Sequence, residues 1–146
     1  MNNIIIIAYL ICLLIIFIPL YIYRGTCPDE KLYRHMNIEK HVYNYLNILS
    51  YVLIGISVFL IISSPYTNTA IYWFALWSII SLHVVHYMYL YDLLYLKKCN
   101  KLLLLLYTMI LSFQLLCSYY INPISGILLA PVLVWYSYLL IQFKEN

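Results

Sequence analysis

Charged side chains are scarce in this chain of 146 residues, where they make up only 9% of the total. A soluble domain carries about 25% charged residues, because its folded surface must be solvated by water. Hydrophobic residues account for 66% of the chain, and the mean hydropathy is +0.90. So few charges cannot cover a globule of this length, which excludes a water-soluble protein and leaves the apolar surface to face lipid.

Familiar catalytic and nucleic-acid-binding motifs are also missing. The sequence contains no glycine-rich phosphate loop, no nucleophile elbow of a serine hydrolase and no basic patch for nucleic acid. We therefore expect no nucleic-acid partner. The four cysteines, Cys12, Cys27, Cys99 and Cys117, form no CxxC pair and lack the spacing of a secreted disulfide framework.

Long apolar runs make up most of the sequence. Backbone groups in lipid must be paired internally, which restricts spanning structures to helices and closed barrels, and these uninterrupted runs lack the alternation of barrel strands. A spanning helix needs about 20 residues. Five segments qualify, namely residues 4–23, 45–63, 70–91, 102–120 and 127–143. We predict an all-α, polytopic membrane helix bundle of about five transmembrane helices, forming a single membrane domain over residues 1–146.

The eight Lys and Arg residues predict the orientation of the bundle. The first loop, residues 24–44, holds four of them, the connection between the third and fourth segments holds three, and the tail holds Lys144. The N-terminus and the other two connections hold none. By the positive-inside rule, the N-terminus lies outside and the C-terminus in the cytosol. The first segment lacks a basic flank before it, so we expect a retained anchor and not a cleaved signal peptide.

Two histidines of the third segment, His83 and His86, are the main ionisable groups inside the predicted membrane region. Three residues apart, they share one face of a helix. They are either hydrogen-bonding groups between helices or weak candidates for metal ligands. A b-type haem needs a histidine from each of two helices, so haem binding requires a partner subunit. Asp92, at the cytosolic end of the segment, is expected to pair with the neighbouring lysines.

The cytosolic side offers one further set of metal-ligand types, consisting of Cys27, His35, His41 and Cys99. Four such ligands are the right number for zinc, although their spacing matches no standard zinc module. Free thiols or juxtamembrane palmitoylation are the other fates open to Cys27 and Cys99. The first loop itself is expected to form either an interfacial helix or a solvated linker.

A resemblance to a known family covers about residues 47–96. Asn47-Ile48-Leu49-Ser50, Ser78, Leu82-His83 and Asp92-Leu93-Leu94 are similar to elements of the alkaline ceramidases and their wider family of membrane hydrolases. The resemblance implies a zinc-dependent lipid amide hydrolase in which His83 binds zinc while Ser78 and Asp92 assist the zinc-bound water. The chain departs from the family in two respects. His83 and Asp92 are nine residues apart instead of eleven, and no histidine follows His86.

Small residues predict where helices approach closely. Gly126 and Ala130 form a small-xxx-small pair at the start of the last segment, and Gly55 and Ser57 offer the same in the second. Together these features favour a non-enzymatic accessory or scaffold subunit that needs no cofactor. Its partners are the lipid bilayer and other membrane proteins or a second copy of itself. The alternatives are a ceramidase-like zinc hydrolase, active or degenerate, and a haem-binding anchor subunit. ER-derived, organellar and viral membranes all fit these features.

Overall fold

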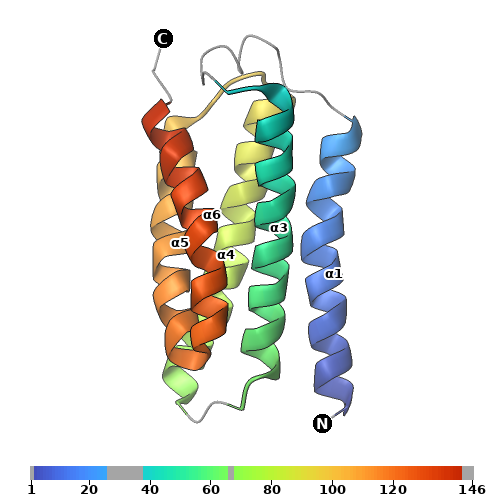
Figure 1. Cartoon of the computed structure of the whole chain (residues 1–146), viewed down its shortest axis with the longest axis vertical. Helices are drawn as coiled ribbons and strands as arrows, with labels where there is room; N and C mark the ends of the chain where they lie inside the picture. The colour runs from blue at the N-terminus through green and yellow to red at the C-terminus, as the bar shows by residue number, and fades with distance from the viewer. Residues whose placement is uncertain (1, 26–37, 66–67, 143–146) are drawn as a thin grey trace.

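The computed structural model describes residues 2–25, 38–65 and 68–142, and all five elements in these ranges are helices. They are α1 (Asn2–Gly25), α3 (Lys40–Ser63), α4 (Thr69–Leu94), α5 (Lys101–Ile121) and α6 (Pro123–Gln142). Successive helices run in alternating directions, so the start of α1 and the end of α6 lie at opposite ends of the molecule (Figure 1). The predicted all-α helix bundle is confirmed, and each predicted apolar segment lies within one helix except for the residues after Gln142.

Four of the helices, α3 to α6, are long and apolar enough to cross a membrane. The apolar stretch found in α1, Asn3–Pro19, is shorter. The four apolar helices are therefore compatible with a multi-pass membrane protein. A fifth transmembrane span through α1 stays a prediction. The predicted helix or linker in the first loop, along with Cys27 and His35, lies outside the described residues.

Asparagine side chains cap the N-termini of three of the helices. The Asn68 and Asn100 side chains accept hydrogen bonds from the backbone N–H groups of Ile71 and Leu103, three residues further on. Asn122 accepts one from the Ile124 N–H, and Pro123 occupies the first position of α6. These bonds satisfy backbone donors that the first helical turn leaves without partners, and proline loses nothing at the first position. The turns between the spans therefore follow from local sequence.

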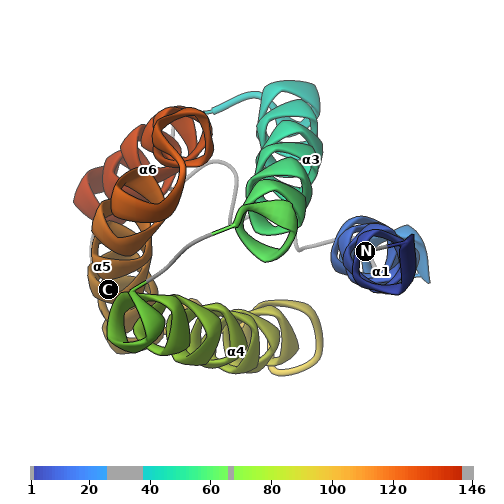
Figure 2. The ribbon, with the colours of Figure 1, turned by 90° about the horizontal axis from the view of Figure 1, so that it is seen from below.

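The helices are arranged in an open arc (Figure 2). Along the arc, α3 packs on α6, α6 on α5 and α5 on α4, while α1 packs on the outer side of α3. No comparable backbone packing joins α3 to α4 among the described residues, although they are the two ends of the arc. Side chains must therefore fill the space between these two helices.

Glycine and serine contacts hold two of the helix pairs together. A Cβ on Gly126 of α6 would lie 2.6 Å from the Cβ of Tyr119 on α5, so only glycine fits this approach. The Ser57 and Ser125 hydroxyls, on α3 and α6, are 2.6 Å apart and buried.

The prediction that Ala130 lies at a close helix contact is wrong. Its side chain is exposed on the outer face of α6, so close approach between α5 and α6 depends on Gly126 and not on the pair.

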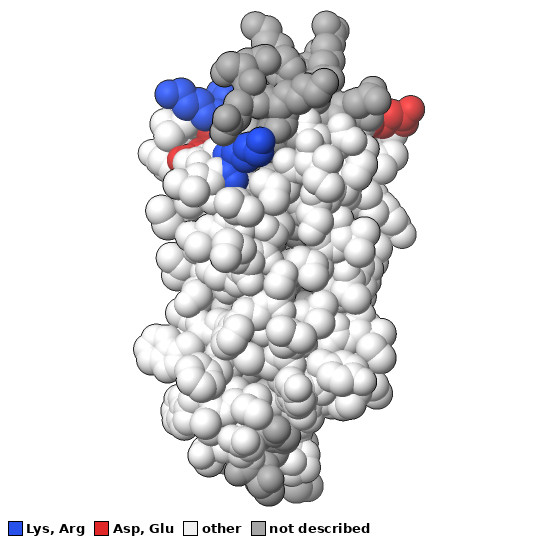
Figure 3. All heavy atoms as spheres, turned by 90° about the vertical axis from the view of Figure 1, so that its left-hand side faces the viewer, with Lys and Arg blue, Asp and Glu red and all other residues white. Residues whose placement is uncertain are grey.

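The described charged side chains gather at one end of the bundle (Figure 3). They are Glu39, Lys40, Asp92, Lys97, Lys98 and Lys101. The remaining length of the described helices carries no charged side chain. This end is the one that the positive-inside rule assigns to the cytosol. Insertion into lipid requires that the length of the helix bundle inside the hydrocarbon region be free of charged side chains, because charge is costly there. The described helices meet this requirement.

Candidate functional site

A histidine surrounded by tyrosine rings occupies the space between α3 and α4. His86 of α4 is only 4% exposed, and its Nε2 lies 3.0 Å from the hydroxyl of Tyr51 on α3. The two rings meet edge to face, with their centroids 5.3 Å apart. Since α3 and α4 lack close backbone packing, this hydrogen bond joins the two ends of the helical arc.

Three further tyrosines complete this central His–Tyr cluster, which consists of His86, Tyr51, Tyr89, Tyr107 and Tyr136. Ring centroids of Tyr107, Tyr136 and Tyr89 lie 5.1, 6.1 and 6.4 Å from that of His86. All five side chains are buried, and they come from all four helices of the arc. Aromatic rings at such distances attract one another through their quadrupoles as well as by burial. The cluster is therefore the packed centre of the bundle.

The two histidines of α4 do not form a common site. His83 is partly buried, and its Nδ1 lies 2.7 Å from the carbonyl oxygen of Ile79, one turn earlier on the same helix. His86 instead directs its Nε2 to Tyr51, while its buried Nδ1 has no hydrogen-bond partner in the described part of the chain. The two imidazoles are three residues apart on one helix, but their hydrogen-bond partners differ.

Ser78, a candidate from the family resemblance, belongs to a separate polar bridge. Its hydroxyl is hydrogen-bonded to the side-chain oxygen of Gln114 on α5, and it also donates to the Ala75 carbonyl at 2.8 Å. The Gln114 amide nitrogen in turn donates to the Ser118 hydroxyl at 3.2 Å. This bridge satisfies a buried glutamine between two spans, which is a structural task.

Asp92 lies at the charged end, away from the two histidines. Its carboxylate accepts a hydrogen bond of 3.0 Å from the Asn100 amide, and its backbone carbonyl accepts one from the Lys98 N–H. Asn100 also caps α5, so the carboxylate helps to fix the connection between α4 and α5. The predicted ion pair of Asp92 with the neighbouring lysines stays a prediction.

The cysteine of the same connection, Cys99, is half-buried. Burial raises the pKa of its thiol to about 12, with the nearby Tyr89 hydroxyl lowering it slightly and Asp92 adding to the increase. A thiol with this pKa is almost fully protonated at neutral pH, so it is a poor nucleophile. His41, from the same predicted zinc set, is exposed and lies 3.4 Å from Glu39. The described residues contain no group of three or more His, Cys, Asp or Glu that could hold a metal ion.

Two structural contacts connect α3 to α6 through residues with no catalytic pattern. The Trp135 indole N–H donates to the Asn47 side-chain oxygen at 3.1 Å, and Ser125 donates to the Ser57 carbonyl at 3.0 Å. Asn47 was singled out in the sequence by the family resemblance, whereas the tyrosines of the central cluster were not singled out. With 18 tyrosines in the chain, composition alone could not distinguish the buried ones from those at the membrane interface.

No family model, curated protein or solved structure matches this chain.

Proposed function

We propose that this chain is a non-enzymatic, multi-pass membrane protein that serves as an accessory or scaffold subunit. One observation carries the proposal: the polar groups of α4 that could perform chemistry each bond to a different partner within the bundle. Ser78 pairs with Gln114, His83 with its own helix, His86 with Tyr51 and Asp92 with Asn100. The bonds of Ser78 and His86 join neighbouring helices, that of Asp92 fixes a helix connection, and that of His83 stays within α4.

Distance along the helix supports the same reading. Ser78 and Asp92 are separated by 14 positions on α4, which corresponds to about 21 Å of rise. His83 and Asp92 are nine positions apart, which places them about 180° from each other around the helix at about 100° per residue. Groups on opposite sides of one helix cannot both reach the same reacting atom, as a hydrolytic site requires. Residues spaced in this way along a single span favour structural roles.

The outer surface supports a role in association with lipid and protein. Large apolar side chains cover the outside of the bundle, and two tryptophans of α4, Trp73 and Trp77, are 60% and 63% exposed. In a membrane, such side chains contact lipid tails or neighbouring helices. An accessory subunit uses this kind of surface to stand beside a larger complex or a second copy of itself.

Assembly and metal content test the proposal together. Membranes solubilised in mild detergent should release the chain within a defined complex, with itself or with another membrane protein, as measured by native electrophoresis and light scattering. The purified protein should contain no stoichiometric zinc and no Soret absorbance. His83→Gln, which keeps a hydrogen-bonding group but is a far poorer zinc ligand, should leave both assembly and metal content unchanged.

The rival functions give different results in the same experiment. Stoichiometric zinc that is lost in His83→Gln, with assembly intact, would overturn the proposal in favour of the ceramidase-like hydrolase. A Soret band that is lost in His86→Gln would do so in favour of a haem-binding subunit. Recovery of the chain only as a monomer would also count against a scaffold role.

A further inference from the structure

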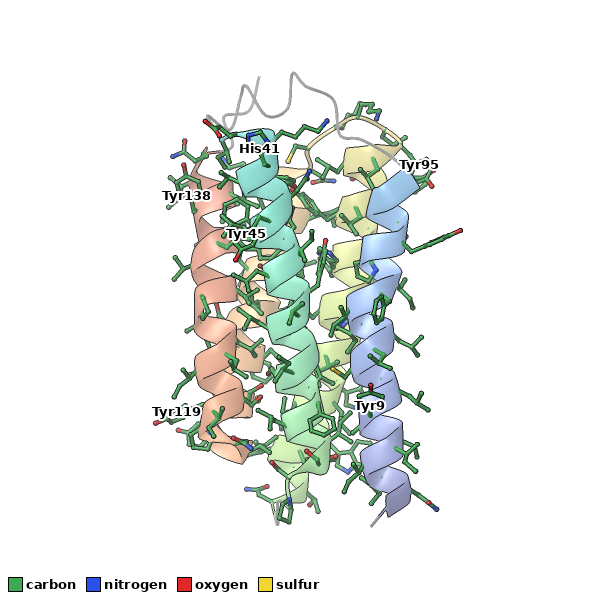
Figure 4. All side chains as sticks on the ribbon, turned by 45° about the vertical axis from the view of Figure 1, so that its right-hand side comes forward. Tyr9, His41, Tyr45, Tyr95, Tyr119 and Tyr138 are labelled. Atoms are coloured by element: carbon green, nitrogen blue, oxygen red, sulfur yellow. The ribbon has the colours of Figure 1, made fainter. Side chains whose placement is uncertain are left out.

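A groove opens on the surface between the start of α3 and the second half of α6. Its volume is about 540 Å³, within the range of about 300–1,000 Å³ typical of small-molecule sites. On the α3 side it is lined by Ile38, Glu39, Val42 and Leu46, and on the α6 side by Pro131, Val134, Trp135 and Tyr138. Figure 4 shows Tyr138 on α6 at the same end of the bundle as His41 of α3.

The aromatic wall of the groove is held in place from behind. Trp135 is buried, its indole N–H is bonded to Asn47, and its ring meets Tyr43 edge to face at 5.8 Å. Tyr138 stacks on Trp135 with an angle of 21° between the ring planes. A surface whose side chains are already ordered loses little entropy when it binds a ligand.

The position of the groove in the bundle indicates which chemical class of ligand fits it. It lies at the charged end of the bundle, where tryptophan and tyrosine mark the boundary between acyl chains and head groups. Among the described residues, its lining contains one charged side chain, Glu39, which is 77% exposed at the rim. An apolar slot with the Glu39 carboxylate at its aqueous end complements a long hydrocarbon chain whose head group ends in an ammonium.

We propose that this groove binds a phospholipid with an ethanolamine head group, one acyl chain lying along Val42, Leu46 and Val134. The ammonium group lies at the Glu39 carboxylate. His41 approaches the Oε2 atom of Glu39 at 3.4 Å, and the Glu39 side chain is 77% exposed, so an ammonium can approach its carboxylate from the aqueous side. A primary ammonium donates hydrogen bonds, whereas the trimethylated ammonium of choline cannot. This inference is independent of the accessory role proposed above.

Fluorescence quenching by brominated lipids tests the site directly, because Trp135 forms part of the groove wall. Trp73→Phe and Trp77→Phe remove the other two tryptophans, both of which are exposed, and leave Trp135 as the single reporter. The protein is placed in phosphatidylcholine nanodiscs with an equal mole fraction of chain-brominated phosphatidylethanolamine, phosphatidylcholine or phosphatidylserine. From the quenching, we expect an apparent affinity for phosphatidylethanolamine about two- to five-fold higher than for phosphatidylcholine. This is the range that one exposed ion pair supports.

A charge-neutral substitution identifies the carboxylate responsible. Glu39→Gln should abolish the preference for ethanolamine over choline. Asp92→Asn neutralises a carboxylate at the same end but outside the groove, and should keep the preference. Equal quenching by all three lipids, an unchanged preference in Glu39→Gln, or no quenching of Trp135 by any lipid, as when a protein partner fills the groove, would each overturn the proposal. Phosphatidylserine, whose extra carboxylate is repelled by Glu39, should rank below phosphatidylethanolamine.

Discussion

Replacing Gly126 by alanine adds one methyl group at the tightest contact between α5 and α6. The new Cβ would lie 2.6 Å from the Cβ, 2.8 Å from the Cα and 2.9 Å from the backbone nitrogen of Tyr119. The shortest of these separations is 0.8 Å less than the 3.4 Å at which ordinary contact begins. Because two of the three atoms belong to the α5 backbone, a side-chain rotation cannot relieve the overlap, and the helices must move apart.

The expected cost follows from two opposing terms. Overpacking a well-packed interface costs about 1–3 kcal/mol. Alanine is a better helix former than glycine by up to about 1 kcal/mol, which offsets part of that loss. We therefore expect Gly126→Ala to lower the free energy of unfolding by about 1–2 kcal/mol. Denaturation by SDS in lipid bicelles, followed by tryptophan fluorescence, measures this difference.

Two substitutions serve as controls for the same experiment. At Gly55, the added Cβ would come within 3.0 Å of side-chain atoms of Ile16 alone, at 2.8 and 2.9 Å, and the nearest backbone atom, the Cys12 carbonyl oxygen, is 3.3 Å away, so Gly55→Ala should cost less than Gly126→Ala. Ala130→Ile changes an exposed position and should leave the stability of the isolated chain unaltered. A Gly126→Ala variant as stable as the wild type, or more so, would refute the close contact between α5 and α6.

Three further measurements follow from the structure. In a cysteine-free background, Ile124→Cys should react with a membrane-impermeant reagent on intact cells and Lys98→Cys only after permeabilisation; labelling of Lys98→Cys from outside would reverse the orientation. A double-mutant cycle of Ser57→Ala and Ser125→Ala should give a coupling of about 0.6 kcal/mol, the average for interhelical hydrogen bonds, whereas additive losses would show that the 2.6 Å contact contributes nothing. With the other cysteines replaced, alkylation of Cys99 should accelerate about ten-fold for each pH unit from 7 to 10, because burial raises its pKa to about 12; a plateau near pH 9 would contradict this burial.

The individual sites show how far sequence reasoning reaches. Gly126 was predicted to lie at a close helix contact, and it is packed directly against Tyr119. Ala130, four residues later, was assigned to the same contact and is exposed instead. A four-residue spacing puts two residues about 40° apart around a helix and about 6 Å apart along it, so a neighbouring helix can cover one position and leave the other exposed.

The sequence by itself determined the class of protein, the helices and the end of the bundle that carries charge. These properties depend on composition, on the length of apolar runs and on the order of lysines along the chain, all of which are one-dimensional. The helix starts also followed locally, since Asn68, Asn100 and Asn122 cap them through bonds that reach only two or three residues.

Only the tertiary structure decided which face of each helix turns inward. In a soluble helix, polar residues mark the outer face, but a helix in lipid is apolar on all sides, so its sequence carries little information about rotation. The inward turn of His86 toward Tyr51, the backbone bond of His83 and the meeting of Tyr107 with Tyr136 all depend on that rotation. So does the groove beside Trp135, whose walls come from helices about ninety residues apart in the chain.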